Sequence, residues 1–510
     1  MMTALFFACK KDAPLVTVIG VTLNKTLTVI VVGDKERLTS TVMPEHASNH
    51  GVVWSSSHAS IASVEQNGEI TAVAAGTATI TVTTVDGNET ATCTVMVVTE
   101  CVQMAITTTK MGEVSFGISG NGPAVIDWGD GTKSSLTLSS DGDGFPAHTY
   151  YTNSPRTITI TGGSITSLFC YYYNEITDLD ISNNPKLKLL FYEGVGNRLT
   201  NLDVSKNAEL EFLNCDNSRL TSLNTSNNPA LEILSCCSNQ LSSLDVSKNP
   251  LLEYLSCNNN QLSSLDVRHN QKLAYLYCND NLLMNLDVSS NIALKRIDCF
   301  RNQLLNLLVN PLLEYLSCYD NKITNLDVSR NAALETLFCF DNQLRNLDIS
   351  RNTALTSLGC SSNQLTDLDV SNNTMLKSLG CSSNQLGSLN LSKNTELGLL
   401  NCSNNQLTVL DVRKNPKLLA LYCNNNRLTS LDMSSNAMLN DLFCGNNFMD
   451  AKALNALFRS LPSFDIKTRT IVGPTVNMIR IGNNGPNCDG SGSAGCDRTI
   501  AEAKGWVVYD

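Results

Sequence analysis

The chain has 510 residues, of which 42% are hydrophobic and 16% are charged, and its formal net charge is -11 at pH 7. The length predicts about three domains, and the hydrophobic content is sufficient to bury their cores, which excludes a disordered chain. The negative charge argues against a protein that binds the phosphate backbone of nucleic acids. Nineteen cysteines would fit a disulfide scaffold or a metal protein, but their positions favour neither class.

The first predicted segment, residues 1–12, is a signal or lipoprotein remnant. Residues 1–8 are mostly apolar but contain no Lys or Arg, and they are too short for a complete signal sequence. The run Phe6-Phe7-Ala8-Cys9, followed by Lys10-Lys11-Asp12, resembles a bacterial lipoprotein processing site, in which a small residue precedes the acylated cysteine. The resemblance implies a lipid at Cys9; the alternative is a frayed N-terminus with an accidental cysteine. Elsewhere no apolar run reaches about 18 residues, so a lipid is the one membrane attachment that we predict.

Residues 13–100 are predicted to form a small β-sandwich. Short runs such as Ile80-Thr81-Val82-Thr83 alternate apolar and polar residues between glycines, which is typical of strands and turns. The sequences Leu23-Asn24-Lys25-Thr26, Val53-Trp54-Ser55-Ser56-Ser57 and Gly68-Glu69-Ile70-Thr71 resemble a bacterial Ig-like domain of group 2. The resemblance implies a spacer or adhesive module without catalytic residues.

Residues 101–164 are predicted to form a second, shorter β domain that also caps the region after it. The sequence Trp128-Gly129-Asp130-Gly131-Thr132, with His148-Thr149-Tyr150 further on, resembles the signature of PKD-type Ig-like domains. Asp127, Asp130 and the loop Asp141-Gly142-Asp143-Gly144 could together hold calcium, which prefers clustered oxygens. Tight hairpin turns explain the same residues, and we favour this simpler reading.

A repeat of 21 residues occupies residues 165–449. Cysteines recur at this interval from Cys215 to Cys299 and, after one step of 19 residues, from Cys318 to Cys444. The segment Leu252-Glu253-Tyr254-Leu255-Ser256-Cys257-Asn258-Asn259-Asn260-Gln261-Leu262 follows the leucine-rich-repeat pattern, with cysteine in place of the third leucine. Cys170 and Tyr192 hold the same position in two imperfect repeats. The spacing therefore predicts a right-handed solenoid of about 14 coils.

Within each coil, the alternation of a short parallel strand turns Leu255 and Cys257 inward and Tyr254, Ser256 and Asn258 outward. Cysteines in one line cannot converge tetrahedrally on zinc. Their spacing of about 4.8 Å between strands also exceeds the roughly 3.8 Å that separates Cβ atoms in a disulfide. We interpret the ladder as small buried apolar side chains. Two asparagine series, which include Asn260 and Asn270, are predicted to hydrogen-bond successive coils.

The cysteine-for-leucine substitution, together with Leu-Asp-Val-Ser-x-Asn, resembles the internalin type of bacterial leucine-rich repeat, in its cysteine-ladder subgroup. The resemblance implies a surface protein that binds a partner through its concave face and has no enzymatic activity. Cys237 follows Cys236 directly, so we predict an exposed thiol on that face.

Aromatic residues concentrate at the outward positions of the concave strands, where polar residues are usual. The predicted ligand-binding residues are Phe212, Tyr254, Tyr275, Tyr277, Phe300, Tyr315, Tyr319, Phe338 and Phe340. Phe169 and Tyr171 precede them, Ser and Gly replace them from Ser357 to Ser382, and Tyr422 and Phe443 follow. Such rings suit contact with a protein or stacking on a sugar. The alternative is a stripe of rings that only cover one another.

Residues 450–510 are predicted to cap the last coil. Leu454, Leu457, Phe458 and Leu461 have helical spacing, and a second helix is expected over 497–504. Cys488 and Cys496 enclose a Gly/Ser-rich loop and either form a disulfide or remain free thiols. The five histidines are scattered and no phosphate-binding glycine loop occurs, so we predict no enzyme, no catalytic residue, no metal and no cofactor.

The sequence thus predicts a mainly β protein with an N-terminal Ig-like β-sandwich, a PKD-like block, a leucine-rich-repeat solenoid and an α/β cap. We expect a monomer, secreted or lipid-anchored on the extracellular face of the bacterial outer membrane. Its expected function is non-enzymatic recognition of a protein on a host or neighbouring cell. The alternatives are glycan binding and a structural role in the envelope.

Overall fold

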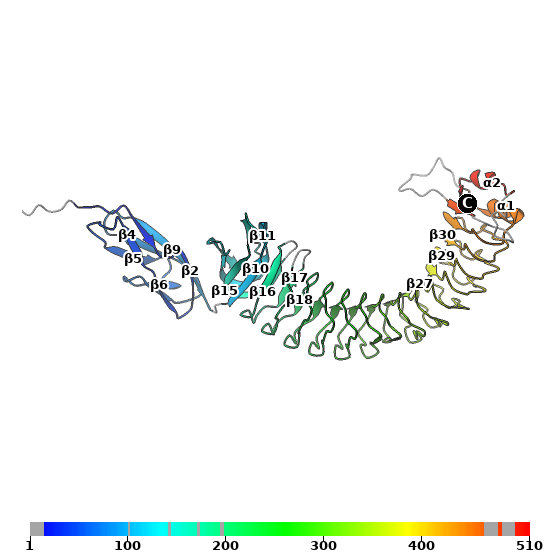
Figure 1. Ribbon diagram of the computed structural model, residues 1–510, viewed down its shortest axis with the longest axis horizontal. Helices are drawn as coiled ribbons and strands as arrows, with labels where there is room; N and C mark the ends of the chain where they lie inside the picture. Colours follow the sequence, from blue (N-terminus) through cyan, green and yellow to red (C-terminus); the bar gives the residue numbers. More distant parts are fainter. Residues whose placement is uncertain are drawn as a thin grey trace, which may run out of the picture. The chain divides into compact units, whose positions relative to one another are not determined.

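The computed structural model describes residues 15–99, 102–140, 144–170, 174–193, 198–463, 478–481 and 495–509. It divides into two compact units, Met1–Leu210 and Glu211–Asp510. The first unit contains the Ig-like domain and a second β block, and the second unit contains most of the solenoid and its cap (Figure 1).

The Ig-like domain is a β-sandwich, as its alternating sequence predicts. One sheet has the order β2 (Leu27–Val31), β9 (Thr90–Val98), β8 (Gly76–Thr84), β5 (Val52–Ser56). A second sheet has the order β3 (Lys35–Arg37), β7 (Glu69–Ala72), β6 (Ala62–Val64), and a third consists of β1 (Gly20–Leu23) paired with β4 (Ser40–Met43). Trp54 is buried in the core between them. Gly68 has φ +82°, and a Cβ there would lie 2.3 Å from the Leu38 carbonyl oxygen, so this turn requires glycine.

The second β block passes directly into the solenoid. Its main sheet contains β10 (Val102–Thr108), β12 (Gly117–Asp127), β13 (Lys133–Leu138), β15 (Arg156–Cys170), β16 (Ile176–Asp180) and β17 (Leu189–Tyr192), beside the pair β11 (Gly112–Ser115) and β14 (Ala147–Tyr150). The long strand β15 pairs antiparallel with β10 and β12, and its last four residues pair parallel with β17. One strand therefore belongs to both the block and the first coil.

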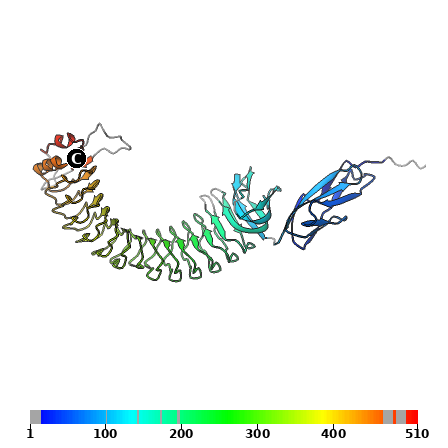
Figure 2. The same ribbon diagram turned by 180° about the vertical axis from the view of Figure 1, so that it is seen from behind.

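The second unit is a curved stack of coils whose strands line the concave side (Figures 1 and 2). Its parallel sheet runs through β18 (Phe212–Asn214), β19 (Ile233–Ser235), β20 (Tyr254–Ser256), β21 (Tyr275–Tyr277), β23 (Arg296–Asp298), β25 (Tyr315–Ser317), β26 (Thr336–Phe338), β27 (Ser357–Gly359), β28 (Ser378–Gly380), β29 (Leu399–Asn401), β30 (Ala420–Tyr422) and β31 (Asp441–Phe443). Where the repeat shortens to 19 residues, β22 (Asn285–Asp287) pairs with β24 (Asn306–Leu308) on the other side of the coil. The mainly β solenoid with a spacing of about 21 residues is confirmed.

The interior of the coils consists of repeated leucines and cysteines. Leu255 and Cys257 are fully buried, and the same holds for the corresponding residues of the neighbouring coils. The amide of Asn260 donates to the carbonyls of Cys236 at 3.0 Å and Cys257 at 3.1 Å and accepts from the Leu241 N–H at 3.0 Å. Asn270 donates to the carbonyls of Val246 and Asn249. The asparagines thus satisfy the buried turn backbone between coils.

The C-terminal residues close the stack. α1 (Ala451–Ser460) buries Leu454, Leu457 and Phe458, and the Asp450 carboxylate caps its N-terminus by accepting from the Ala453 N–H at 2.7 Å. β32 (Met478–Arg480) and β33 (Val507–Tyr509) continue the parallel sheet after β31. The second helix, α2 (Thr499–Glu502), is shorter than the predicted span of 497–504.

Candidate functional site

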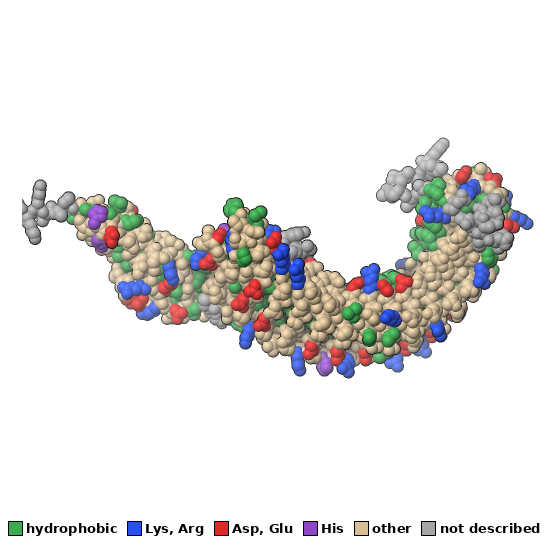
Figure 3. All heavy atoms as spheres, viewed as in Figure 1, with side chains coloured by type: hydrophobic (Ala, Val, Ile, Leu, Met, Phe, Trp, Pro, Cys, Tyr) green, Lys and Arg blue, Asp and Glu red, His purple; other side chains and the backbone are tan. Residues whose placement is uncertain are grey.

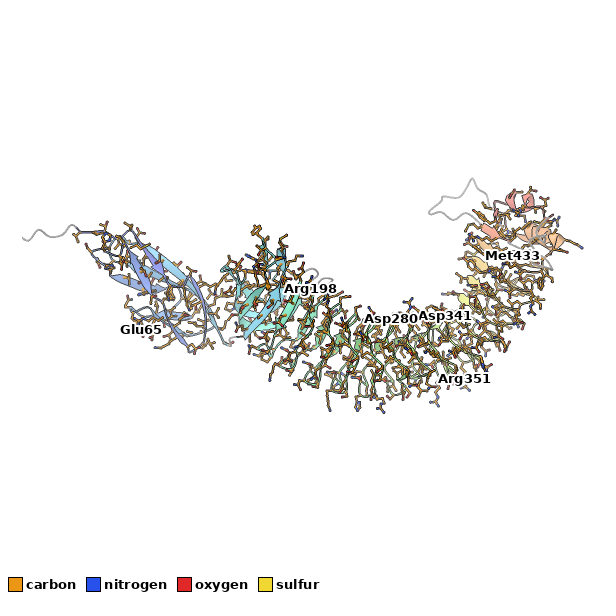
Figure 4. All side chains as sticks on the ribbon, viewed as in Figure 1. Glu65, Arg198, Asp280, Asp341, Arg351 and Met433 are labelled. Carbon is orange, nitrogen blue, oxygen red and sulfur yellow. The ribbon has the colours of Figure 1, made fainter. Side chains whose placement is uncertain are left out.

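The outward side of the concave sheet has three columns of side chains. The first residue of each strand forms the first column, the third residue forms the second, and the residue after each ladder cysteine forms the third. In the coil of β20 these residues are Tyr254, Ser256 and Asn258. Figure 4 shows Asp280, which follows the third column, on the inner side of the arc and Arg351 on the outer side.

Eight of the predicted residues lie in five consecutive coils, those of β20, β21, β23, β25 and β26, either on the strand or just after its ladder cysteine. We name these eight residues the concave aromatic patch: Tyr254, Tyr275, Tyr277, Phe300, Tyr315, Tyr319, Phe338 and Phe340. The parallel register brings their columns together, because Tyr254 is paired with Tyr275 and Ser317 with Phe338. Phe212 is in the first column on β18, and Ile233 on β19 lies between it and Tyr254.

The rings in the first two columns meet at angles. The Tyr254 ring centroid lies 6.4 Å from that of Tyr275 and 5.3 Å from that of Tyr277. Tyr315 and Phe338 meet edge to face at 6.1 Å. Tyr275 is 43% exposed, so the patch presents an aromatic side chain to solvent.

The third column is a face-to-face stack. Phe300, Tyr319 and Phe340 have nearly parallel rings with centroid distances of 4.4 Å and 4.2 Å between successive residues. These three rings cover one another, which is the packing stripe that the sequence left as an alternative. The stack supports the neighbouring column because Phe340 also contacts Phe338 at 6.5 Å.

A charged pair lies within the patch, and its arginine was missed by sequence reasoning. Arg296 begins β23 in the first column, and its Nε donates to Oδ2 of Asp298 at 2.7 Å. The guanidinium carbon lies 3.8 Å from the Tyr315 ring centroid and 5.6 Å from that of Tyr277. Asp298 is buried, and desolvation raises the pKa of its carboxyl above the ordinary value. The available signal was a single arginine in a column of aromatic residues.

The patch ends at two strands without large outward side chains. β27 and β28 place Gly359 and Gly380 in the second column, and a Cβ at Gly359 would lie 3.0 Å from the Phe338 ring. Further along, Tyr422 and Phe443 pack at 4.9 Å, and Arg480 lies 5.0 Å from the Phe443 ring. Figure 3 shows hydrophobic side chains gathered on the inner side at this C-terminal end.

The prediction of an exposed thiol at Cys237 is wrong in its degree of exposure. Cys237 lies in the third column but is half-buried, with Sγ 2.9 Å from Ser256 Oγ and 2.8 Å from Asn258 Oδ1. The Asp216 carboxylate accepts from its backbone N–H at 2.6 Å. Burial, followed by the charge of Asp216, raises the pKa of the Cys237 thiol to about 11.

The aspartates of the PKD-like signature are engaged with their neighbours. Asp127 pairs with Lys133 at 3.0 Å, and Asp130 pairs with His148 at 2.7 Å. The Thr132 hydroxyl donates to Asp130 at 2.6 Å and contributes most to lowering the Asp130 pKa to about 2. These contacts are those of a stabilised turn, which accounts for both carboxylates. Asp141 and Asp143 lie outside the described residues.

The remaining predicted positions fall mainly outside the described residues. Cys9, Tyr171 and Cys488 are among them, so the proposed lipid and the proposed disulfide stay predictions. Cys496 is described and half-buried. In the first unit, Phe169 contacts Phe191 with a centroid distance of 6.3 Å. None of the helices in the described ranges is long and apolar enough to cross a membrane.

These features define a leucine-rich-repeat protein with a cysteine ladder. The repeats resemble the functional domain of InlJ from Listeria monocytogenes, which includes a cysteine ladder: 37% identity, TM-score 0.51, covering 57% of this chain and 70% of that one. The plant peptide hormone receptor RGFR1, solved in complex with RGF2, shares the fold at 17% identity and TM-score 0.50, over 64% of this chain and 65% of that one. The chain belongs to the internalin-type, cysteine-ladder leucine-rich-repeat proteins.

The N-terminal region has its own relatives. Residues 17–95 match the family of bacterial Ig-like domains of group 2. A segment of 92 residues is 48% identical to an uncharacterized protein of Clostridium acetobutylicum, covering 18% of this chain but 9% of that protein. A segment of 80 residues is 45% identical to a second uncharacterized protein of that organism, covering 16% of this chain and 20% of that protein. The chain thus spans less than a quarter of these curated relatives.

Proposed function

We propose that this protein is a non-enzymatic cell-surface binding protein that recognises a protein on a host or neighbouring cell through the concave aromatic patch. The single observation that carries the proposal is the concentration of eight aromatic residues in five consecutive coils, on the side of the sheet that faces away from the core. Tyrosine and arginine in a partly desolvated cluster are the residues that most often dominate protein interfaces.

A protein partner is favoured over a glycan by the state of the polar groups beside the rings. A sugar site combines a stacking ring with accessible carboxylates or amides. Asp298 is buried against Arg296, and the Asn279 amide donates to the Asp280 carboxylate at 2.8 Å. Both groups already have partners, so they offer less to a sugar hydroxyl than the rings and the guanidinium offer to a protein.

The proposal is tested by measuring binding of the full chain to host and neighbouring cells and to arrays of extracellular proteins and glycans. The test variant combines Tyr275→Ala, Tyr277→Ala, Tyr315→Ala and Phe338→Ala. A matched control replaces four exposed apolar residues outside the three columns: Met284, Leu305, Val409 and Met438. We expect the patch variant to lose binding and the control to retain it. Equal binding by both variants would exclude the concave aromatic patch as the binding site.

We also propose that a lipid at Cys9 anchors the protein to the outer membrane and that the two β domains act as spacers for the repeats. The small residue before Cys9 supports the lipid, and the similarity of the repeats to an internalin supports an extracellular location. Mass spectrometry of the mature N-terminus tests it. A diacylglyceryl cysteine at position 9 is expected, and an unmodified chain that begins before Cys9 would contradict the anchor.

A further inference from the structure

Arg296 occupies a distinctive position in the concave aromatic patch. In the three outward columns from β18 to β31, all of which the structure describes, it is the one Lys or Arg. We infer that Arg296 is the residue with which the patch recognises a carboxylate, carried by an aspartate or glutamate side chain of a protein partner. This inference rests on the proposed function and specifies the chemistry of its ligand.

The orientation of the guanidinium is fixed by three contacts. Its Nε donates to the buried Asp298, and its carbon lies near the rings of Tyr315 and Tyr277 on the two adjacent strands. The Nη1 and Nη2 groups have no hydrogen-bond partner among the described residues. Arginine binds carboxylates most strongly with two parallel N–H donors, and these two groups supply them. Ordering this side chain before binding reduces the entropy that the ligand must overcome.

The guanidinium of Arg296 remains accessible to solvent although a carboxylate lies beside it. The Arg296 side chain is 38% exposed, whereas that of Asp298 is 6% exposed. The carboxylate therefore lies beneath the guanidinium and orients it without covering it. The nearby Arg301 differs, because it lies beside both Asp280 and Asp320, at 3.6 Å and 3.9 Å. Within the patch, Arg296 is thus the cation available to an acidic group of a ligand.

The surrounding rings indicate what should flank the acidic group. Tyr254, Tyr275 and Phe338 offer apolar contact area on either side of Arg296, and Tyr275 is the most exposed of them. A glutamate or aspartate between apolar side chains would place its carboxylate on the guanidinium and its neighbours on the rings. Shielding by those neighbours strengthens a charge-assisted hydrogen bond, since the local dielectric constant falls.

The experiment uses a phage library of random 12-residue peptides, selected on the full chain. The selected peptides are then synthesised, and their affinities are measured for the intact protein and for Arg296→Gln. Each affinity is measured before and after replacement of each acidic residue of the peptide by its amide. We expect selected peptides to contain Asp or Glu beside an apolar residue. One acid-to-amide change should weaken binding to the intact protein about tenfold or more, and binding to the variant less than about twofold. This double-mutant cycle measures the coupling of the two groups.

Two further variants distinguish recognition from structure. Arg296→Lys keeps the charge but lacks the two parallel donors, so it should restore only part of the preference for acid. Asp298→Asn removes the charge that orients the guanidinium, so it should reduce the preference while the thermal unfolding temperature of the repeats changes little. A lower unfolding temperature in all three variants, with the preference for acid retained, would assign the pair to stability alone and overturn the inference.

The outcomes separate this inference from the proposed function. The selected peptides could bind the intact protein, fail to bind the quadruple patch variant, and yet show no preference for acidic residues. That result would overturn the role of Arg296 and leave the patch as the binding face. Selection of no peptides overturns both. The intact chain could instead bind uronic-acid oligosaccharides through Arg296 and bind no acidic peptide. That result would overturn the assignment to a protein partner.

Discussion

Thr225 donates a hydrogen bond from Oγ1 to Oδ1 of Asn249 in the next coil, at 2.8 Å. Most coils place valine, leucine or isoleucine at the position of Thr225. One coil later, Val246 cannot donate, and Oδ1 of Asn270 is buried without a hydrogen-bond partner in the described structure. On this side of the solenoid, the Asn249 side-chain oxygen therefore has a hydrogen-bond donor in Thr225, whereas the Asn270 side-chain oxygen receives none from Val246.

The relationship predicts the effect of Val246→Thr. The new hydroxyl should donate to Asn270, so the free energy of unfolding of the repeats should stay unchanged or rise by up to about 1 kcal/mol. Thr225→Val should lower it by roughly 1–2 kcal/mol, because Asn249 then loses its donor. Calorimetry of the intact chain measures both changes. Val246→Ala is the control: it removes methyl groups without adding a donor and should be destabilising. Equal destabilisation by Val246→Thr and Val246→Ala would contradict the prediction.

A second prediction concerns the tight turn after each ladder strand. Ser362 adopts φ +51°, a left-handed conformation that disfavours residues with a Cβ atom. Ser362→Gly should therefore stabilise the repeats or leave them unchanged, with a gain of up to about 1 kcal/mol, whereas Ser362→Val should destabilise them by more than that. Urea unfolding followed by circular dichroism distinguishes the two variants. A valine variant as stable as the glycine variant would show that the turn can adjust its backbone.

The reactivity of Cys237 should depend on pH. Because the pKa of its thiol is raised to about 11, little thiolate is present at pH 8, and alkylation by iodoacetamide should be slow and should accelerate up to about pH 11. Asp216→Asn removes a nearby negative charge and should lower the pKa and speed alkylation at pH 8. Peptide mass spectrometry identifies the modified cysteine. The fully buried Cys257 serves as the internal control and should react only after unfolding. Rapid labelling of native Cys237 at pH 7 would contradict the burial described for it.

The turn at Asp130 should contribute to stability in a defined pH range. Its folded-state pKa is about 2, below the ordinary 3.8, so the carboxylate stabilises the folded state above about pH 4, and this contribution is lost as the pH falls toward 2. Asp130→Asn should lower the unfolding temperature of the first unit at pH 6, and the difference from the unchanged protein should shrink by pH 2. Thr132→Val, which removes the principal donor to Asp130, should give an intermediate result. A difference independent of pH would assign the effect to the turn geometry rather than to the charge.

The sequence alone determined the architecture of the repeats. The interval of 21 residues and the alternation within each strand are local properties, and they place Leu255 and Cys257 inside and Tyr254 outside in every coil of this kind. The ladder also follows from the sequence, because a residue that recurs in each coil must lie beside its own equivalents. The same reasoning predicts that the inward cysteines form neither a zinc site nor a series of disulfides.

The tertiary structure decided which outward side chains touch and which remain accessible. Periodicity assigns Tyr277, Arg296 and Tyr315 to one face, but it does not determine that the arginine lies near both rings while Asp298 is buried beneath it. The sequence pattern likewise did not indicate that Ser256 and Asn258 enclose the thiol of Cys237. The physical reason is that the face of a side chain is set by its own strand, whereas its contacts depend on the side-chain conformations and sizes of residues in neighbouring coils, about 20 positions away in the sequence.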